Sequence, residues 1–386
     1  MRRPTIVFTG ALAVALITGC DAIRNPAQPS SPQLSQSDHT TMLDLGTLGG
    51  TRSDGLAINE RGQVVGLSTT ASGELHAFLW DGTMHDLGTL GGNYSEPRGM
   101  NARGEVVGLS STASGEQHAF LWDGQTMRDL GTLGGSFSDA AALNAEGQVV
   151  GHSFTASGED HAFLWDGTAM QDLGTIGGSF RLSAVALNAA DQVVGEWNPP
   201  GPGGFPRAFF WESGVMQDLG TLGGQAVVVA ALNGRGQAAG QSLNRDGHFH
   251  AFLWQGGTMQ DLGTLEGGGG ESFGAAMNDA GQVAGRSDIA GTWHAFLWSG
   301  GTMQDLGTLG FQSSATAINA HGQVVGFSDV RPSETHGFFW DGQAMHDLGT
   351  VGGTSSFAAD INARGQIVGR STNTAGQSHA VLWDMN

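Results

Sequence analysis

The chain has 386 residues, which is enough for two average domains or one large all-β domain. Its 16 basic residues are all arginine, and its 36 acidic residues give a net charge of −20. So acidic a surface repels phosphate backbones and argues against nucleic-acid binding, while the absence of lysine excludes P-loop and Schiff-base chemistry. The single cysteine excludes an intramolecular disulfide and a thiolate metal cluster.

The first forty residues are typical of an export signal followed by a linker. Arg2 and Arg3 precede an apolar run over residues 6–17, which is too short to remain in a membrane as a helix. We therefore predict a signal peptide over residues 1–19. Residues 20–41 are rich in proline, serine and glutamine, and we expect them to form a disordered tether.

The end of the apolar run carries a possible anchoring signal. The string Ile-Thr-Gly-Cys at residues 17–20 resembles the bacterial lipoprotein box. This resemblance implies that Cys20 is lipidated and holds the chain to a membrane, outside the cytoplasm, in the periplasm or on the cell surface. The alternative is an ordinary secretory signal in which the cysteine is incidental.

From Met42 onward the chain is one unit repeated eight times. The tryptophan that ends each HAFLW-like string recurs every 42–46 residues, and the aspartate of DLG and a single asparagine recur with it. The tryptophans are Trp80, Trp122, Trp165, Trp211, Trp254, Trp298, Trp340 and Trp383. A period near 43 is typical of solenoids and propellers, and we expect the tryptophans to pack between adjacent repeats.

Each unit contains four short strand-like segments. The first ends at the repeated asparagine, and the others read QVVG, HAFLW and MxDLG. Asn-x-x-Gly and Asp-Gly turns separate them, because glycine accepts a positive φ without strain. Four short strands in about 43 residues match one blade of a β-propeller.

The order of the strands predicts how the fold closes. The repeats begin with a strand of the fourth type and end with one of the third type, so that residues 42–45 can pair with residues 379–382. Such pairing would leave no open sheet edge. We predict an all-β fold over residues 42–386, a closed eight-bladed propeller of four-stranded blades. An open β-superhelix, or a ring with a different strand grouping, is the alternative.

The strings DLGTLGG, INxxGQVVG and HAFLW resemble the HAF family of probable extracellular repeats, over residues 42–383. This resemblance implies an exported repeat protein and implies no particular activity. The strand order is also similar to that of WD-repeat propellers, in which a tryptophan ends the third strand.

Histidine opens the third strand in seven units, and Arg207 takes its place in the fourth. We expect each of these side chains to pair with the aspartate of the last strand of its own blade. The expected pairs include His118 with Asp129, Arg207 with Asp218 and, across the closure, His379 with Asp44. Because arginine keeps a hydrogen-bond donor but is no metal ligand, pairing is favoured over a metal site, and no cofactor is predicted.

Aromatic residues gather in the loops that vary between units, which in a propeller open on one face. The candidate contact residues are Tyr94, Phe137, Phe180, Trp197, Phe205, Phe273 and Trp293. Exposed rings on one rim favour a binding face for a protein or glycan partner. The alternative is that the rings pack under their own loops.

These features predict a membrane-anchored, monomeric binding or scaffold protein of the bacterial cell envelope, which is not an enzyme. A carbohydrate-binding propeller is the alternative. An enzyme with an active site in the channel is less favoured, because no acid, base and nucleophile converge in the pattern. The G-x-S-x-G string at residues 270–274 lacks the strand–turn–helix context of a nucleophile elbow, so we interpret it as accidental.

Overall fold

The computed structural model describes residues 41–385, apart from residues 180, 201–203 and 268. The predicted signal peptide (residues 1–19), the lipidation site Cys20 and all but the last residue of the predicted tether lie outside the described residues, so these remain predictions. Within the described residues, none of the secondary structure is a helix that could span a membrane.

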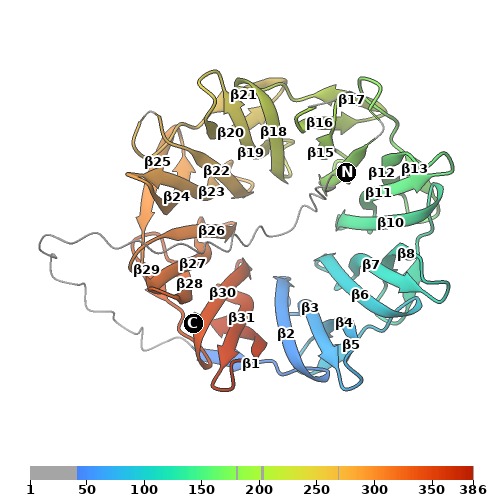
Figure 1. The fold of residues 1–386 in the computed structure, drawn as a ribbon, viewed down its shortest axis with the longest axis horizontal. Helices are drawn as coiled ribbons and strands as arrows, with labels where there is room; N and C mark the ends of the chain where they lie inside the picture. The colour runs from blue at the N-terminus through green and yellow to red at the C-terminus, as the bar shows by residue number, and fades with distance from the viewer. Residues whose placement is uncertain (1–40, 180, 201–203, 268, 386) are drawn as a thin grey trace, which may run out of the picture. The chain divides into compact units, whose positions relative to one another are not determined.

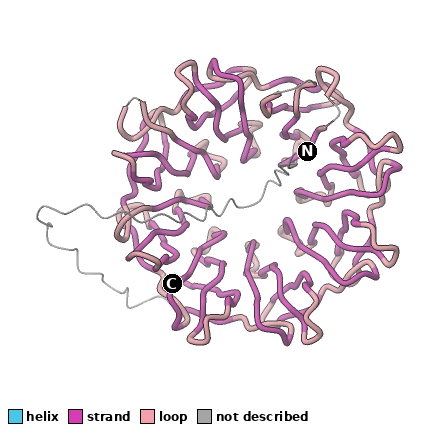
Figure 2. Tube along the Cα trace, in the orientation of Figure 1, coloured by secondary structure: helices cyan, strands magenta, loops and turns pink. Residues whose placement is uncertain are grey.

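The described residues form β-strands joined by turns and loops (Figure 2). The first four repeats contain β2 (Gly49–Ile58), β3 (Val64–Thr70), β4 (Leu75–Trp80) and β5 (Met84–Asp86); β6 (Gly91–Met100), β7 (Val106–Thr112), β8 (Gln117–Trp122) and β9 (Met127–Asp129); β10 (Gly134–Leu143), β11 (Val149–Thr155), β12 (Asp160–Trp165) and β13 (Met170–Asp172); and β14 (Leu182–Leu187), β15 (Val193–Trp197), β16 (Arg207–Glu212) and β17 (Val215–Asp218).

The next four repeats follow the same plan. They contain β18 (Gly223–Leu232), β19 (Ala238–Asn244), β20 (Phe249–Gln255) and β21 (Thr258–Asp261); β22 (Ser272–Met277), β23 (Val283–Ile289), β24 (Thr292–Ser299) and β25 (Thr302–Gly307); β26 (Ser313–Ile318), β27 (Val324–Arg331), β28 (Glu334–Trp340) and β29 (Met345–Asp347); and β30 (Gly352–Ile361), β31 (Gln366–Asn373), β32 (Ser378–Asp384) and β1 (Thr41–Asp44). We number these runs of four strands repeats 1 to 8.

Within each repeat, neighbouring strands pair antiparallel. The glycine of QVVG permits close pairing of the first two strands. A Cβ added at Gly66 would lie only 2.0 Å from the carbonyl oxygen of Asp54 and 2.8 Å from the ring of Phe78. A larger residue here would therefore push apart the first, second and third strands of the repeat.

The hydrophobic core lies between consecutive repeats and not within them. In one cluster, Val107 and Leu121 of repeat 2 pack with Phe163 and Trp165 of repeat 3. Seven further clusters are built in the same way, each from side chains of two neighbouring repeats. Six of the eight repeated tryptophans are buried, and Trp80 and Trp122 are half-buried. Each repeat sheet is thus covered on both faces by its neighbours (Figure 1).

The two ends of the described chain meet in one sheet. β1 pairs antiparallel with β32, with Thr41 opposite Asp384 and Asp44 opposite Val381. One core cluster joins Phe78 of repeat 1 to Leu382 of repeat 8. In Figure 1, accordingly, β2 lies beside β30 and β31.

Candidate functional site

The residue at the start of each third strand pairs with the aspartate of the last strand in the same repeat. The shortest contacts between the side chains are 2.7–3.0 Å: His76–Asp86, His118–Asp129, His161–Asp172, Arg207–Asp218, His250–Asp261, His294–Asp305, His336–Asp347 and His379–Asp44. Arg207 of repeat 4 thus occupies the place of histidine and keeps the contact. The hydrogen bond to Asp261 raises the pKa of His250 above its usual value.

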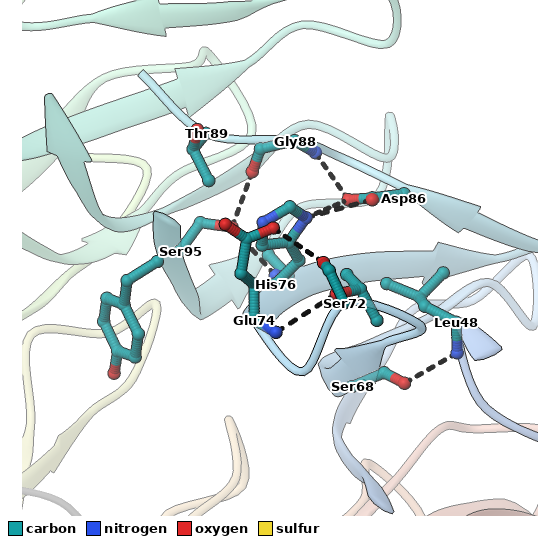
Figure 3. Close-up of polar contacts among 12 residues, drawn as sticks. Leu48, Ser68, Ser72, Glu74, His76, Asp86, Gly88, Thr89 and Ser95 are labelled. Atoms are coloured by element: carbon teal, nitrogen blue, oxygen red, sulfur yellow. Dashed lines mark hydrogen bonds and ion pairs between the residues drawn. The ribbon is translucent and has the colours of Figure 1, made fainter. Parts of the chain in front are cut away.

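These pairs belong to a network that connects neighbouring repeats (Figure 3). Asp86 accepts a hydrogen bond from the backbone N–H of Gly88, whose carbonyl oxygen accepts one from Ser95 Oγ at 2.6 Å. Ser95, on the first strand of the next repeat, is fully buried and accepts the N–H of Ala77 at 2.9 Å. The pair of His76 and Asp86 therefore holds the loop to which the next repeat is bonded.

A serine takes this position in six repeats, and the serine of the G-x-S-x-G string is one of them. Ser272 is fully buried, accepts the N–H of Ala251 at 2.8 Å and donates to the carbonyl oxygen of Gly263 at 2.6 Å. Its hydroxyl is therefore a link between repeats and not a nucleophile. Repeats 4 and 5 replace the serine by Leu182 and Val227, which join the core clusters.

The repeated asparagine makes a second set of links between repeats, which sequence reasoning did not find. Asn59 Nδ2 donates to the carbonyl oxygen of Asn101 at 3.3 Å. The same bond recurs from each asparagine to the next, through Asn101, Asn144, Asn188, Asn233, Asn278, Asn319 and Asn362, at 3.0–3.3 Å. Asn362 donates to the carbonyl oxygen of Asn59 at 3.1 Å, so the series returns to its start.

On the side of the sheets opposite these asparagine turns, a shallow groove of about 790 Å³ lies between repeats 2 and 3. Its aromatic lining comes from Tyr94 on β6, Phe137 on β10 and Phe154 on β11. The loop between β7 and β8, residues 113–116, supplies small and polar groups and the carboxylate of Glu116. Two of the predicted face residues, Tyr94 and Phe137, thus line one cavity.

A charged cluster adjoins Tyr94. The Tyr94 hydroxyl donates to Glu96, and Arg98 bridges Glu96 at 2.8 Å and Asp139 of the next repeat at 3.2 Å. Burial raises the pKa of the Asp139 carboxyl, and Arg98 opposes this rise. Burial and the bond to Glu96 raise the pKa of the Tyr94 phenol. His152 lies opposite Asp139 in the pairing of β10 with β11, and its ring packs against that of Phe137 at 5.4 Å between centroids.

The other predicted face residues are scattered. Trp197 does not lie on an exposed face: its side chain is only 8% exposed and belongs to the core cluster between repeats 3 and 4. It lies opposite Leu182 in the strand pairing, at the position that the buried Ser68 holds in repeat 1. Phe205 is 46% exposed, and Phe180 lies outside the described residues. Phe273 and Trp293 contact each other in repeat 6, at 5.4 Å between ring centroids. Among the residues that the structure covers, no three His, Cys, Asp or Glu side chains are grouped as a metal site requires.

Comparison with known proteins gives structural likeness alone. No family model and no curated protein matches the chain, so the resemblance to HAF repeats stays a prediction. Three similar solved structures are the β-propeller domain of the trilobed protease from Pyrococcus furiosus (TM-score 0.51, 12% identity, 77% of this chain and 97% of that chain), a Mycobacterium tuberculosis puromycin-hydrolysing peptidase (0.54, 14%, 84% and 58%) and Porphyromonas gingivalis dipeptidyl peptidase 4 (0.58, 10%, 87% and 58%).

The chain is therefore an all-β protein with a β-propeller fold. It corresponds to 58% of the length of each of the two whole peptidases. These neighbours also correct the predicted function. We expected a membrane-anchored scaffold that is not an enzyme, with a glycan-binding propeller as its alternative. This expectation is overturned because the similar solved propellers belong to peptidases.

Proposed function

We propose that this chain is a peptidase-type propeller that binds peptides in the groove between repeats 2 and 3. The observation that carries the proposal is the groove itself, in which Tyr94, Phe137 and Phe154 line one cavity of about 790 Å³. The fold likeness to the propellers of three peptidases supports a role in peptide hydrolysis.

The lining suits an extended peptide that carries apolar and basic side chains. Aromatic rings offer apolar surface to such side chains, and neighbouring backbone groups offer hydrogen bonds to a peptide main chain. Glu116 lies at the rim with a side chain that is 47% exposed, and its carboxylate attracts a cationic residue. The net charge of −20 favours basic peptides further, by steering them at long range.

In this proposal the propeller binds the peptide, and a hydrolase domain in the same or another chain supplies the nucleophile. Among the described residues, the only hydroxyl bonded to a histidine is that of Thr83, which contacts His85 Nε2 at 3.0 Å. The same nitrogen contacts Asp81 at 2.9 Å. A catalytic triad needs the nucleophile and the carboxylate on different ring nitrogens, so these three residues do not form one.

Fluorescence anisotropy with labelled, unstructured octapeptides tests the proposal. We expect the wild-type protein to bind peptides with apolar and basic residues, and the Tyr94→Ala and Phe137→Ala variants each to bind about tenfold more weakly, as expected when an aromatic contact is lost. Phe311→Ala is the matched control, since this ring is 54% exposed and lies outside the groove. No binding by the wild-type protein, or an equal loss in the control, would overturn the proposal.

We further propose that the propeller is a closed ring of eight blades. Three features support this: the pairing of β1 with β32, the core cluster that joins repeats 8 and 1, and the bond from Asn362 to Asn59. The trilobed protease propeller is described as having an open Velcro topology, in which such a pairing would be missing. Small-angle scattering tests the proposal, because a compact body of 345 residues has a radius of gyration of about 20 Å, and a clearly larger value would contradict it.

A further inference from the structure

Repeat 6 holds an arginine in a corner of aromatic rings. Arg286 lies on β23, and its Cζ is 5.0 Å from the centroid of the Phe273 ring and 4.7 Å from that of Trp293. The two rings meet edge to face, with an interplanar angle of 69°. The guanidinium therefore rests against both rings at once.

This guanidinium has no acceptor within the part of the chain that the structure describes. No hydrogen bond or ion pair joins the Arg286 side chain to another described residue. Arg98 and Arg207, by contrast, contact carboxylates at 2.8 and 2.7 Å. Arg286 is half-buried, and burial lowers its pKa while the more distant Glu271 carboxylate opposes that change. None of the Arg286 side-chain nitrogens is sealed from solvent, so a bound carboxylate can reach them and form a charge-assisted hydrogen bond.

The fold does not require an arginine at this position. Arg286 is the eighth residue after the repeated asparagine, and the same position in other repeats holds Leu67, Leu109, His152, Glu196, Gln241 and Phe327. Repeat 8 alone repeats the arrangement. There Arg370 lies opposite Phe357 in the pairing of β30 with β31, with its Cζ 4.6 Å from that ring and likewise no described acceptor. Two of the eight repeats thus pair an arginine with a phenylalanine across the first and second strands, and in neither does the guanidinium have a described acceptor.

We infer that Arg286, with Phe273 and Trp293, forms a binding site for a carboxylate, and that its ligand is the free carboxylate of a peptide. The guanidinium fork matches a carboxylate in two parallel hydrogen bonds, and the rings hold the fork in one orientation. The choice of a peptide as the source of the carboxylate rests on the proposed function. The site itself is separate from the groove, because Arg286 is in repeat 6 and the groove is between repeats 2 and 3.

The test uses the full chain and two forms of one probe, acetyl-Gly-Gly-Phe with a free carboxyl terminus and the same peptide as its amide. We follow the Arg286 side-chain Nε–H signal by NMR during titration and measure affinity by calorimetry. We expect the acid to shift this signal and to bind at least about tenfold more tightly than the amide, as for a charge-assisted hydrogen bond. Inorganic phosphate is the third probe. The guanidinium fork fits phosphate as well, but phosphate has no side chain to pack against the Phe273 and Trp293 rings, so we expect it to bind more weakly than the acid.

Two variants separate this site from the groove. Arg286→Lys keeps the charge but loses the planar fork, and should reduce the advantage of the acid over the amide to less than about threefold, whereas Tyr94→Ala should leave that ratio unchanged. Equal binding of acid and amide by the wild-type protein, an unchanged ratio in Arg286→Lys, or tighter binding of phosphate than of the acid would each overturn the carboxylate site. If the wild-type protein does not bind octapeptides in the groove assay, the proposed function is overturned, and the carboxylate site at Arg286 is not.

Discussion

The series of asparagine bonds gives a direct measure of how much one link between repeats stabilises the fold. Asn362 makes four hydrogen bonds. Its Oδ1 accepts the N–H groups of Arg364 and Gln366 at 3.0 Å, and its Nδ2 donates to Gln366 Oε1 at 3.0 Å and to the carbonyl oxygen of Asn59 at 3.1 Å. Replacing Asn362 by alanine removes all four, and the Asn59 carbonyl then accepts only the N–H of Gly62, at 3.0 Å.

Asn373 in the same repeat is a matched control. Its Oδ1 accepts the N–H groups of Ala375 and Gln377 at 2.9 and 3.0 Å, and its Nδ2 donates to Gln377 Oε1 at 3.1 Å. These are the same three local bonds, without one to another repeat. The two alanine variants should therefore differ by the link alone. Because the Asn59 carbonyl still accepts the Gly62 N–H, the variant loses only the net contribution of one hydrogen bond, so Asn362→Ala should be about 1 kcal/mol more destabilising than Asn373→Ala.

Equilibrium unfolding in urea, followed by tryptophan fluorescence, measures this difference. Asn319→Ala serves as a second comparison, because Asn319 makes the same bond to the carbonyl oxygen of Asn362 at 3.1 Å. In a closed ring, the link from repeat 8 to repeat 1 should count as much as the link from repeat 7 to repeat 8. A difference below about 0.5 kcal/mol between the Asn362 and Asn373 variants would refute the reasoning. A clearly smaller effect for Asn362 than for Asn319 would refute equal links around the ring.

Three further predictions concern other contacts between strands. Burial raises the pKa of Asp360 to about 6, above its value of about 3.9 in an unfolded chain. The folded state therefore binds more protons than the unfolded state between these pH values, and the free energy of unfolding should fall by about 2–3 kcal/mol as the pH rises through them. Asp360→Asn should remove this difference between urea titrations at pH 4 and pH 7, and an unchanged difference would show that another group causes it. Ser95→Ala should cost about 2–3 kcal/mol, because it leaves two buried backbone groups unpaired, while the exposed Ser72→Ala should cost under about 0.5 kcal/mol in the same assay. Arg207→His should change stability by less than about 0.5 kcal/mol, since histidine can contact Asp218 as in the other repeats; a larger loss in thermal unfolding would contradict their equivalence.

Local features of the fold were predictable from the sequence because they repeat within one unit. Strand positions followed from the turn glycines and apolar runs, and the contact of His118 with Asp129 followed from the adjacent third and last strands. The bond from Asn59 to Asn101 was not predicted, because its partners are 42 residues apart and meet only through the packing of two sheets. The signal was available, since an asparagine that never varies at a turn indicates more than turn geometry.

The candidate site was only partly predictable. Tyr94 and Phe137 were singled out as variable aromatic residues, but their meeting in one groove depends on how β10 of repeat 3 packs against β7 and β8 of repeat 2. Trp197 was assigned to a variable loop, but it takes the strand position that Ser68 holds in repeat 1, and both side chains are buried. The corner around Arg286 was missed because only comparison of the same strand position across repeats reveals that this arginine is unusual.

The pairing of β1 with β32 means that the chain can be circularly permuted. Thr41 and Asp384 face each other across neighbouring antiparallel strands, so a short linker can join the two ends of the repeat region. New termini can then be placed in any exposed loop, such as residues 71–74 between β3 and β4. Such a circular permutant would carry four contiguous strands in every repeat but the one that was opened, and its melting temperature should stay close to that of the parent chain.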